Sequence, residues 1–402
     1  MSARSSRNNF DFALLIVGGG MAAGRLVKEL RSQGFADSVA VVCAEPYMGY
    51  NRVLLPDYLA GACSLEEMHA GVHQAATVFL RTTVQSLQPA QRRVVFADGR
   101  SCSYRRLVLA TGSLVPAPAL AAAQPDTVSQ LRNLHDVQRI QQQLHGAASA
   151  VVIGGGLLGL EAADALARLG LRVRIVHRGA RLMTRQIDDL ASSLLVAGLG
   201  ECNIRVSLNA TVAAAHTEHG RQQVILSTGE TCDADLIITA TGAQPNDQLA
   251  RAAGLACDQG VQTNLFLQTN VPDVYAMGEC ACVDGQRQQL VAQLNQQAAA
   301  LAATLGGAPT PVAKNPVSTR LKMQRIALFA AGEIQSQRQP GVQNISLLDP
   351  VAGVYRLLQF DQQRLLGAVL LGDTRASREI VQRIDTELST SEQEQLAFGL
   401  AA

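Results

Sequence analysis

The sequence predicts an α/β protein made of two copies of one strand–helix–strand plan, followed by a small α+β domain. The first observation is that Ala13–Leu30 resembles Ser149–Leu166, since each has an apolar run, a glycine turn and a helical pattern. The second is that each copy continues into another apolar strand, at Val39–Glu45 and at Leu171–Arg178. The third is an alternation of apolar and polar residues around turns over 346–373, which predicts the strands of the last domain.

Each copy also contains a predicted hairpin and ends in a Thr-Gly turn. The hairpin turns are marked by Asp98-Gly99 and by Thr228-Gly229. Segments 114–127, 241–248 and 305–316 have the composition of linkers. We therefore expect one domain formed by residues 10–117 and 246–313, a second formed by residues 118–245, and a C-terminal domain of residues 314–402.

Composition excludes several classes of function. The net charge is +1, from 34 Lys and Arg against 33 Asp and Glu, so we expect no nucleic-acid surface. No apolar run reaches the roughly 18 residues that a membrane span needs. None of the eight cysteines forms a C-x-x-C pair, so we expect no metal site, and scattered reduced thiols are typical of a cytoplasmic protein.

The first glycine turn has the pattern of a dinucleotide site, Gly18-x-Gly20-x-x-Ala23. Glycine lets a pyrophosphate approach the N–H groups at a helix N-terminus, where the peptide dipoles favour negative charge. The small Ala23 allows the helix to pack closely on the strand. Glu45 follows the next strand, where an acid can bind the hydroxyls of an adenosine ribose.

The second glycine turn, Gly154-x-Gly156-x-x-Gly159, is a complete fingerprint with a different residue after its second strand. His177 stands there instead of an acid, and Arg178 follows it. A carboxylate would repel a 2′-phosphate, whereas His and Arg would tolerate or attract one. The sequence therefore leaves open whether the coenzyme is NADH or NADPH, and whether His177 is only a polar residue at a strand end.

Glu161 lies in the first turn of the helix that follows the second glycine turn. A carboxylate is stabilised at a helix N-terminus, so capping electrostatics alone would explain the position. Contact with the nicotinamide carboxamide is the functional alternative, and both interpretations stay open.

Two nucleotide sites in one chain predict two different nucleotides, FAD in the first and NADH or NADPH in the second. Thr111 and Gly112 form the turn at the end of the first copy, near the bound nucleotide. Glu279 follows a short apolar strand and Gly278, where a carboxylate would hold the ribitol hydroxyls of the flavin.

With these motifs, the chain resembles the pyridine nucleotide-disulfide oxidoreductase superfamily, in the branch that lacks the active disulfide. Within that branch it is most similar to the flavoprotein part of the assimilatory NAD(P)H nitrite reductase large subunit and to the electron-transfer subunit of assimilatory nitrate reductase. The resemblance is carried by five segments: Ala44–Gly61, Leu182–Asp188, Tyr275–Ala281, Ser318–Glu333 and Gly367–Asp373. It implies two Rossmann-like dinucleotide-binding domains of the three-layer ββα type and a small C-terminal interface domain.

The resemblance also implies roles for particular residues. Arg52 would reach FAD, at its phosphates or at a neighbouring charge, and Lys322 would lie in the C-terminal domain, where a solvated surface lysine is the simpler interpretation. FAD would be bound by Gly18, Gly20, Ala23, Glu45, Arg52, Thr111, Gly112, Gly278 and Glu279. NADH or NADPH would be bound by Gly154, Gly156, Gly159, Glu161, His177 and Arg178.

Three departures from related reductases bear on function. Pro56-Asp57 stands where related rubredoxin and ferredoxin reductases often have Ser-Lys, so a second basic group near FAD is expected to be missing. The segment from Tyr50 to Leu59 holds no cysteine, so we expect electrons to leave directly from the flavin. No cysteine follows Cys282, so we expect no cluster or sirohaem module within these residues and an acceptor on another molecule.

The leading hypothesis is an NAD(P)H-dependent FAD oxidoreductase that passes electrons to a separate redox protein in nitrate or nitrite assimilation. That partner would be the catalytic subunit of nitrate reductase, or a ferredoxin- or rubredoxin-like carrier. Two alternatives are a rubredoxin or ferredoxin reductase of another pathway, and a binding or signalling module that responds to NADH. No catalytic side chain is required for hydride transfer, because alignment does most of the work. The sequence leaves open the acceptor, a homodimeric state, and the roles of Lys322, Cys280 and Cys282.

Overall fold

The computed structural model describes residues 9–69, 76–116, 128–218, 221–287, 290–313, 316–334 and 341–398. The chain divides into two compact units. Unit 1 comprises residues 1–52, 64–116 and 243–315, and unit 2 comprises residues 53–63, 117–242 and 316–402. The expected boundary between residues 117 and 118 lies outside the described residues, so the division into three domains stays a prediction.

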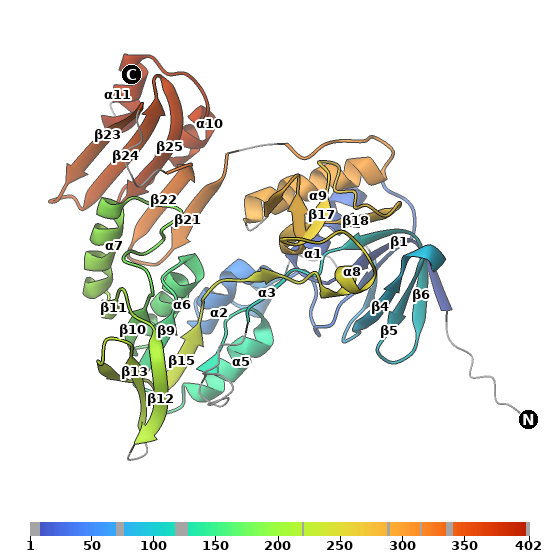
Figure 1. Cartoon of the computed structure of the whole chain (residues 1–402), viewed down its shortest axis with the longest axis horizontal. Coiled ribbons are helices and arrows are strands. Elements are labelled where there is room, and N and C mark those ends of the chain that lie inside the picture. The colour runs from blue at the N-terminus through green and yellow to red at the C-terminus, as the bar shows by residue number, and fades with distance from the viewer. Residues whose placement is uncertain are drawn as a thin grey trace, which may run out of the picture. The chain divides into compact units, whose positions relative to one another are not determined.

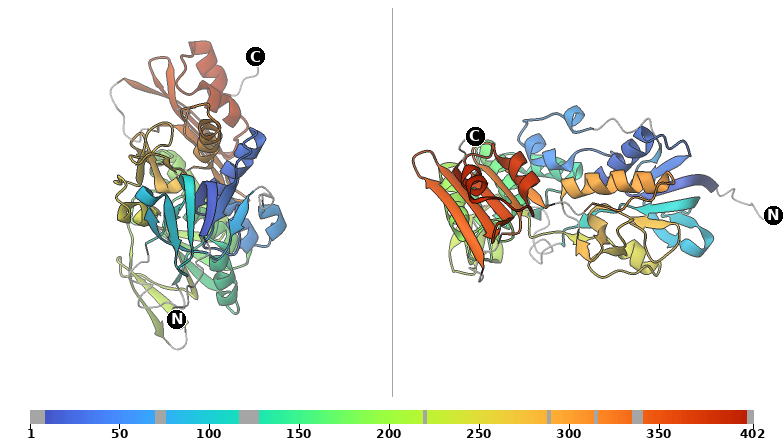
Figure 2. Two further views of the ribbon diagram at one scale, coloured as in Figure 1. Left: turned by 90° about the vertical axis from the view of Figure 1, so that its right-hand side faces the viewer. Right: turned by 90° about the horizontal axis from the view of Figure 1, so that it is seen from above.

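Unit 1 is built on a mostly parallel sheet with the strand order β3-β2-β1-β6-β5-β4, and β18 pairs with β6. These strands are β1 (Asn9–Val17), β2 (Val39–Val42), β3 (Thr77–Phe79), β4 (Val84–Gln88), β5 (Arg93–Phe96), β6 (Ser101–Leu109) and β18 (Val274–Ala276). Helices α1 (Met21–Ser32) and α9 (Val291–Leu305) cover the sheet, and α9 is the long orange helix in the right-hand view of Figure 2. Ala23 and Leu26 of α1 are fully buried, because they recur at helical spacing on the face that packs on the sheet.

Unit 2 contains a parallel sheet with the order β11-β10-β9-β15-β8. Its strands are β8 (Val128–Ser129), β9 (Ser149–Ile153), β10 (Arg172–Val176), β11 (Ile204–Ser207) and β15 (Leu236–Thr239). Helices α5 (Leu134–Gln143), α6 (Leu157–Arg168) and α7 (Asp189–Glu201) belong to the same unit, together with a separate antiparallel sheet of β12 (Val212–Glu218), β13 (Arg221–Leu226) and β14 (Thr231–Asp233) (Figure 1). Near-continuous apolar strands such as β15 are expected where helices cover a parallel sheet on both faces.

The expected repeat of the strand–helix–strand plan is confirmed. In unit 1, β1 lies between β2 and the returning strand β6, and in unit 2, β9 lies between β10 and the returning strand β15. The predicted hairpin turns are also present, since Gly99 and Gly229 both adopt positive φ between paired strands. Both halves thus present the carboxyl end of a central strand to the N-terminus of the following helix, which is where α/β sheets bind ligands.

The strands predicted near the C-terminus form an antiparallel sheet with the order β21-β22-β25-β24-β23. The elements of this part are β21 (Ser318–Lys322), β22 (Ala327–Gly332), β23 (Val342–Asp349), β24 (Val354–Asp361), β25 (Arg364–Leu371), α10 (Ser377–Arg383) and α11 (Thr390–Phe398). Phe360 and Leu365 of the sheet pack with Ile380 of α10 and Leu396 of α11 in one core. Among the described residues, no helix combines the length and apolar character that crossing a membrane requires.

Candidate functional site

The first glycine turn joins β1 to α1 and admits only glycine at its start. Gly18 has φ +109°, and a Cβ there would lie 2.1 Å from the carbonyl oxygen of Ala110. The N-cap of α1 is Gly20, which has no side chain to cap the first N–H groups of the helix. These N–H groups are therefore available to an anion.

The second glycine turn, between β9 and α6, repeats this geometry. Gly154 has φ +124°, and a Cβ there would lie 2.3 Å from the carbonyl oxygen of Ala240. Gly156 is the N-cap of α6, and a Cβ on it would meet nothing within 4 Å. A Cβ on Gly159 would lie 2.0 Å from the carbonyl oxygen of Gly154, so this third glycine allows the helix to pack against the loop. In the first copy, the buried Ala23 occupies the corresponding position of α1.

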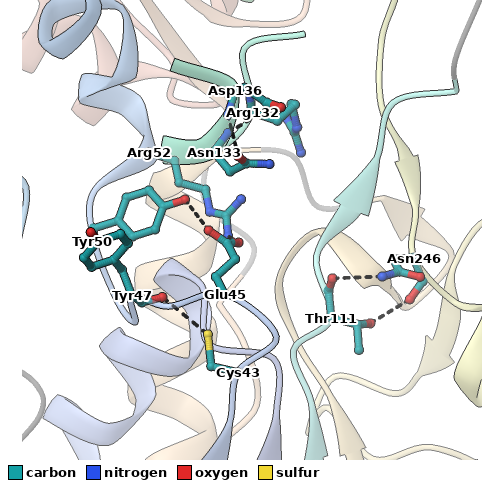
Figure 3. Close-up of polar contacts among 10 residues, drawn as sticks. All are labelled: Cys43, Glu45, Tyr47, Tyr50, Arg52, Thr111, Arg132, Asn133, Asp136 and Asn246. Carbon is teal, nitrogen blue, oxygen red and sulfur yellow. Dashed lines mark hydrogen bonds and ion pairs between the residues drawn. The ribbon is translucent and has the colours of Figure 1, made fainter. Parts of the chain in front are cut away.

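Glu45 and Arg52, both predicted to contact FAD, lie together in unit 1. The guanidinium of Arg52 forms an ion pair with the Glu45 carboxylate, and the Tyr50 hydroxyl donates to the same carboxylate at 2.6 Å (Figure 3). Arg52 also lies near the N-terminus of α1, since a Cβ on Gly20 would be 3.8 Å from its Nη2. Tyr50 was not predicted, although its place two residues before Arg52 indicates that it belongs to the same element.

The other predicted FAD residues follow β6 and β18. Thr111 donates to the carbonyl oxygen of Asn246 at 2.6 Å, and Asn246 N–H donates to the carbonyl oxygen of Gly112 at 2.9 Å (Figure 3 shows Thr111 beside Asn246). Because β18 pairs with β6, the ends of these two strands meet at one edge of the sheet. The structure thereby brings Thr111 and Gly112 to the same edge as Gly278 and Glu279.

Two further side chains support this edge of the sheet. The Ser113 hydroxyl donates to the Glu279 carboxylate. The Gly278 N–H donates to Oε1 of Gln297 at 2.7 Å, and Gln297 is fully buried on α9. Neither Ser113 nor Gln297 was predicted, and only Ser113 carried a signal, because it directly follows the Thr-Gly turn. Together the glycine turn, the ion pair and these strand ends form a set of polar groups in unit 1 that is suited to a ligand with an anionic group and several hydroxyls.

Glu161 is buried on α6 and faces the C-terminal sheet of its own unit. The predicted place in the first turn is wrong, because Glu161 is the fifth residue of the helix, beyond the N–H groups that capping electrostatics involve. Its side chain is 3% exposed, and its Oε1 accepts a hydrogen bond from the backbone N–H of Lys322 at 3.1 Å. Asp164, one turn later, accepts from the N–H of Gln324 at 3.4 Å. Burial raises the pKa of Glu161 to about 7, although the Lys322 N–H acts in the opposite direction. The backbone of Lys322 thus contacts a predicted site residue, and a role for Glu161 toward nicotinamide stays a prediction.

His177 and Arg178 follow β10 and differ in their surroundings. Nδ1 of His177 accepts the N–H of Gly155 at 3.1 Å, and burial lowers the pKa of the imidazole. Arg178 is exposed. The uncharged ring therefore supports the glycine turn, while the guanidinium remains directed to solvent.

The cysteines form no redox pair. All eight are free thiols, and both Cys280 and Cys282 are buried. The Cys280 thiol lies 3.2 Å from the carbonyl oxygen of Met277, and burial raises its pKa. In the part of the chain that the structure describes, no group of three or more His, Cys, Asp or Glu side chains could hold a metal ion.

Comparison with known proteins gives two family matches. The model of the pyridine nucleotide-disulphide oxidoreductases matches residues 12–302, and that of the rubredoxin NAD+ reductase C-terminal domain matches residues 316–388.

Individual relatives match four fifths of the chain or more. The assimilatory nitrate reductase electron transfer subunit of Bacillus subtilis is 32% identical over 92% of this chain. The ferredoxin–NAD(+) reductase component of the biphenyl dioxygenase system of Paraburkholderia xenovorans is 31% identical over 80% of this chain and 81% of its own length. The crystal structure of a putidaredoxin reductase–putidaredoxin complex is 25% identical, with a TM-score of 0.84 over 97% of this chain and 95% of its own. The chain spans about half the length of the nitrate and nitrite reductase relatives it matches, 48% for the first.

Proposed function

Because the chain belongs to the pyridine nucleotide-disulphide oxidoreductase family, we propose that it is an NAD(P)H-dependent FAD oxidoreductase that passes electrons to a separate redox protein. FAD would bind in unit 1, and NADH or NADPH would bind at the glycine turn of unit 2. We propose a cytoplasmic location for it. The expected homodimer stays a prediction.

The arrangement of charges around α1 is the observation that carries this proposal. Arg52 lies over the N-terminus of α1, so a pyrophosphate there would meet both the helix N–H groups and a guanidinium. Glu45 lies beside it and can accept hydrogen bonds from ribose hydroxyls, as it now accepts that of Tyr50. Glu279, which follows β18, can do the same for the ribitol hydroxyls.

FAD, when bound, supplies the capacity to accept a hydride and to release electrons singly or in pairs. The chain contributes binding and alignment. Gly156 leaves the N-terminus of α6 open to a second pyrophosphate, and Gly159 keeps that helix close to its loop. Residues 50–59 hold no cysteine that could relay electrons from the flavin, so we propose that electrons pass directly to an external acceptor.

A reduction experiment tests the proposal. Protein reconstituted with FAD is mixed anaerobically with NADH or NADPH while the flavin absorbance is followed, and an artificial one-electron acceptor is then added. We expect bleaching by at least one coenzyme and recovery of colour on addition of the acceptor. Flavin that neither coenzyme bleaches would refute the proposal.

Site variants make the test specific to unit 1. Arg52→Ala should weaken FAD binding by about tenfold to a hundredfold, the scale of one hydrogen bond to a charged group. Arg92→Ala is the matched control, because Arg92 also forms an ion pair in unit 1, with Asp273 at 2.5 Å, but follows β4 rather than the glycine turn. Equal FAD affinities in the two variants would contradict the role of Arg52.

The physiological pathway has two candidates. The 32% identity to a nitrate reductase electron transfer subunit supports a role in nitrate or nitrite assimilation. The relative from the biphenyl dioxygenase system matches over most of its own length and supports a ferredoxin- or rubredoxin-type reductase instead. Rates of electron transfer to purified ferredoxin, rubredoxin and nitrate reductase catalytic subunit would separate them, since the physiological acceptor should be reduced fastest.

A further inference from the structure

The loops after the second strands of the two repeats share one backbone frame. The N–H of Gly18 donates to the carbonyl of Val42, and the N–H of Gly154 donates to that of Val176, both at 2.9 Å. Three more backbone hydrogen bonds of the first repeat have a counterpart in the second. In the first repeat, the N–H groups of Cys43, Thr82 and Arg81 donate to the carbonyls of Phe79, Cys43 and Glu45, respectively. In the second, the N–H groups of His177, Ala210 and Asn209 donate to the carbonyls of Ser207, His177 and Gly179, in the same order. Gly179 is therefore the structural equivalent of Glu45, and Arg178 is the equivalent of Ala44. The sequence analysis placed His177 at the position of the acid, which is wrong, since His177 is the equivalent of Cys43.

This equivalence removes the ribose-binding carboxylate from the second site. Gly179 has no side chain, and residues 177–187 contain no acid. The next acids along the chain are engaged elsewhere, because Asp188 accepts the Tyr355 hydroxyl at 2.9 Å and Asp189 pairs with Arg181 at 3.2 Å. The loop thus lacks the group that would accept hydrogen bonds from the ribose hydroxyls of NADH.

The cations of the same loop are not equally available. Arg181 donates to the carbonyl of Ile187 at 2.7 Å in addition to its ion pair, and the uncharged His177 ring supports Gly155. Arg178 and Arg185, by contrast, are exposed, and neither makes a hydrogen bond or ion pair with any residue that the structure describes. Of the two, Arg178 directly precedes Gly179, the equivalent of Glu45, whereas Arg185 lies six residues beyond it. A free guanidinium is suited to a phosphate dianion, because its N–H groups match two phosphate oxygens.

We infer that the second site takes NADPH in preference to NADH, and that Arg178 contacts the 2′-phosphate of the coenzyme. This rests on the proposed function only in that unit 2 binds a nicotinamide coenzyme. The 2′-phosphate adds the negative charge that a carboxylate at position 179 would repel.

Calorimetric titration of the FAD-loaded protein with 2′,5′-ADP and with 5′-AMP tests the inference without any redox step. We expect 2′,5′-ADP to bind about tenfold or more tightly than 5′-AMP, and Arg178→Ala to remove most of that difference. Arg205→Ala, on the adjacent strand β11 and also exposed, is the control that should keep the difference. Gly179→Glu should weaken the binding of 2′,5′-ADP, because the new carboxylate would repel the 2′-phosphate. A Cβ at this position would lie 3.0 Å from Nε2 of His177 and 3.8 Å from the carbonyl oxygen of Arg181.

The outcomes separate this inference from the proposed function. Equal binding of the two nucleotides, no binding of either, or an unchanged preference in Arg178→Ala would overturn the inference. Flavin bleached equally well by low concentrations of NADH and NADPH would also overturn it, while leaving the proposed function intact. A clear preference for 2′,5′-ADP together with flavin that neither coenzyme bleaches would support the inference and refute the proposed function.

Discussion

Replacing Glu161 by Gln should remove a pH dependence from the stability of unit 2. Glu161 is 3% exposed, and the charged groups that face its carboxyl group are Lys322 on β21, Asp57 on the 53–63 segment, and Asp164 on its own helix. Arg168 pairs with Asp57 at 2.9 Å, so it offsets part of the negative charge of this cluster. Glutamine keeps an oxygen that can accept the Lys322 N–H, and it cannot ionise.

The magnitude follows from the pKa of Glu161, which burial raises from the ordinary 4.5 to about 7. An acid with a higher pKa in the folded chain holds its proton longer when folded. Its contribution to stability is therefore complete below about pH 4.5 and is lost as the pH rises through 7. Between about pH 5 and about pH 8.5, this loss amounts to about 2.5 kcal/mol in the free energy of unfolding.

Urea unfolding followed by circular dichroism at these two pH values is the assay. The wild-type protein should lose about 2.5 kcal/mol more between them than Glu161→Gln does. Glu394→Gln on α11 is the control: Glu394 is exposed, and no hydrogen bond or ion pair joins its carboxylate to another described residue. This control should behave as the wild type. Parallel pH profiles for wild type and Glu161→Gln would refute the reasoning.

Three further changes test other parts of the structure. Gly18→Ala should destabilise unit 1 by more than about 2 kcal/mol in thermal unfolding, because the new Cβ would lie 2.1 Å from a carbonyl oxygen. The control is Gly200→Ala in α7, where a Cβ would meet nothing within 4 Å, so that this variant should be as stable as the wild type or more stable. Tyr355→Phe should cost about 1 to 2 kcal/mol, because the Asp188 carboxylate loses a donor, and unchanged stability would show that water replaces it. Alkylation of the native protein, followed by mass spectrometry, should find four buried thiols protected and the other four labelled. The buried thiols are Cys43, Cys102, Cys280 and Cys282. Equal labelling of all eight thiols would contradict the packing.

The parts of the site that depend on local backbone geometry could be predicted from the sequence. Only glycine fits at positions 18 and 154, because the turn there has a positive φ and a carbonyl oxygen lies where a Cβ would be. Such local requirements are visible in the sequence as a short glycine motif. Glu45 and Arg52 are only seven residues apart, so one segment carries both. The overall repeat was equally visible, since apolar strands and helical spacing recur in the same order.

The remaining contacts join residues that are distant in the sequence, and no short sequence pattern predicts them. Ser113 meets Glu279, and Gln297 holds the N–H of Gly278 from another helix. Glu161 was expected either to stabilise its own helix or to face nicotinamide, but its carboxylate binds the backbone of Lys322, 161 residues away. Such pairs depend on how strands and helices pack, which periodicity and motifs do not specify.

The chain passes between the two units five times, at about residues 52, 63, 116, 242 and 315. During synthesis, β18 and α9 of unit 1 therefore leave the ribosome only after residues 117–242 of unit 2 have been made. Neither unit can therefore fold from one contiguous stretch of nascent chain. Until the last segment of unit 1 has been made, an apolar face of the unit 1 sheet stays partly uncovered in early folding intermediates. During synthesis, this order favours protection of that face by a chaperone, and it predicts that truncation at any point before residue 315 yields aggregation-prone fragments and no isolated flavin domain.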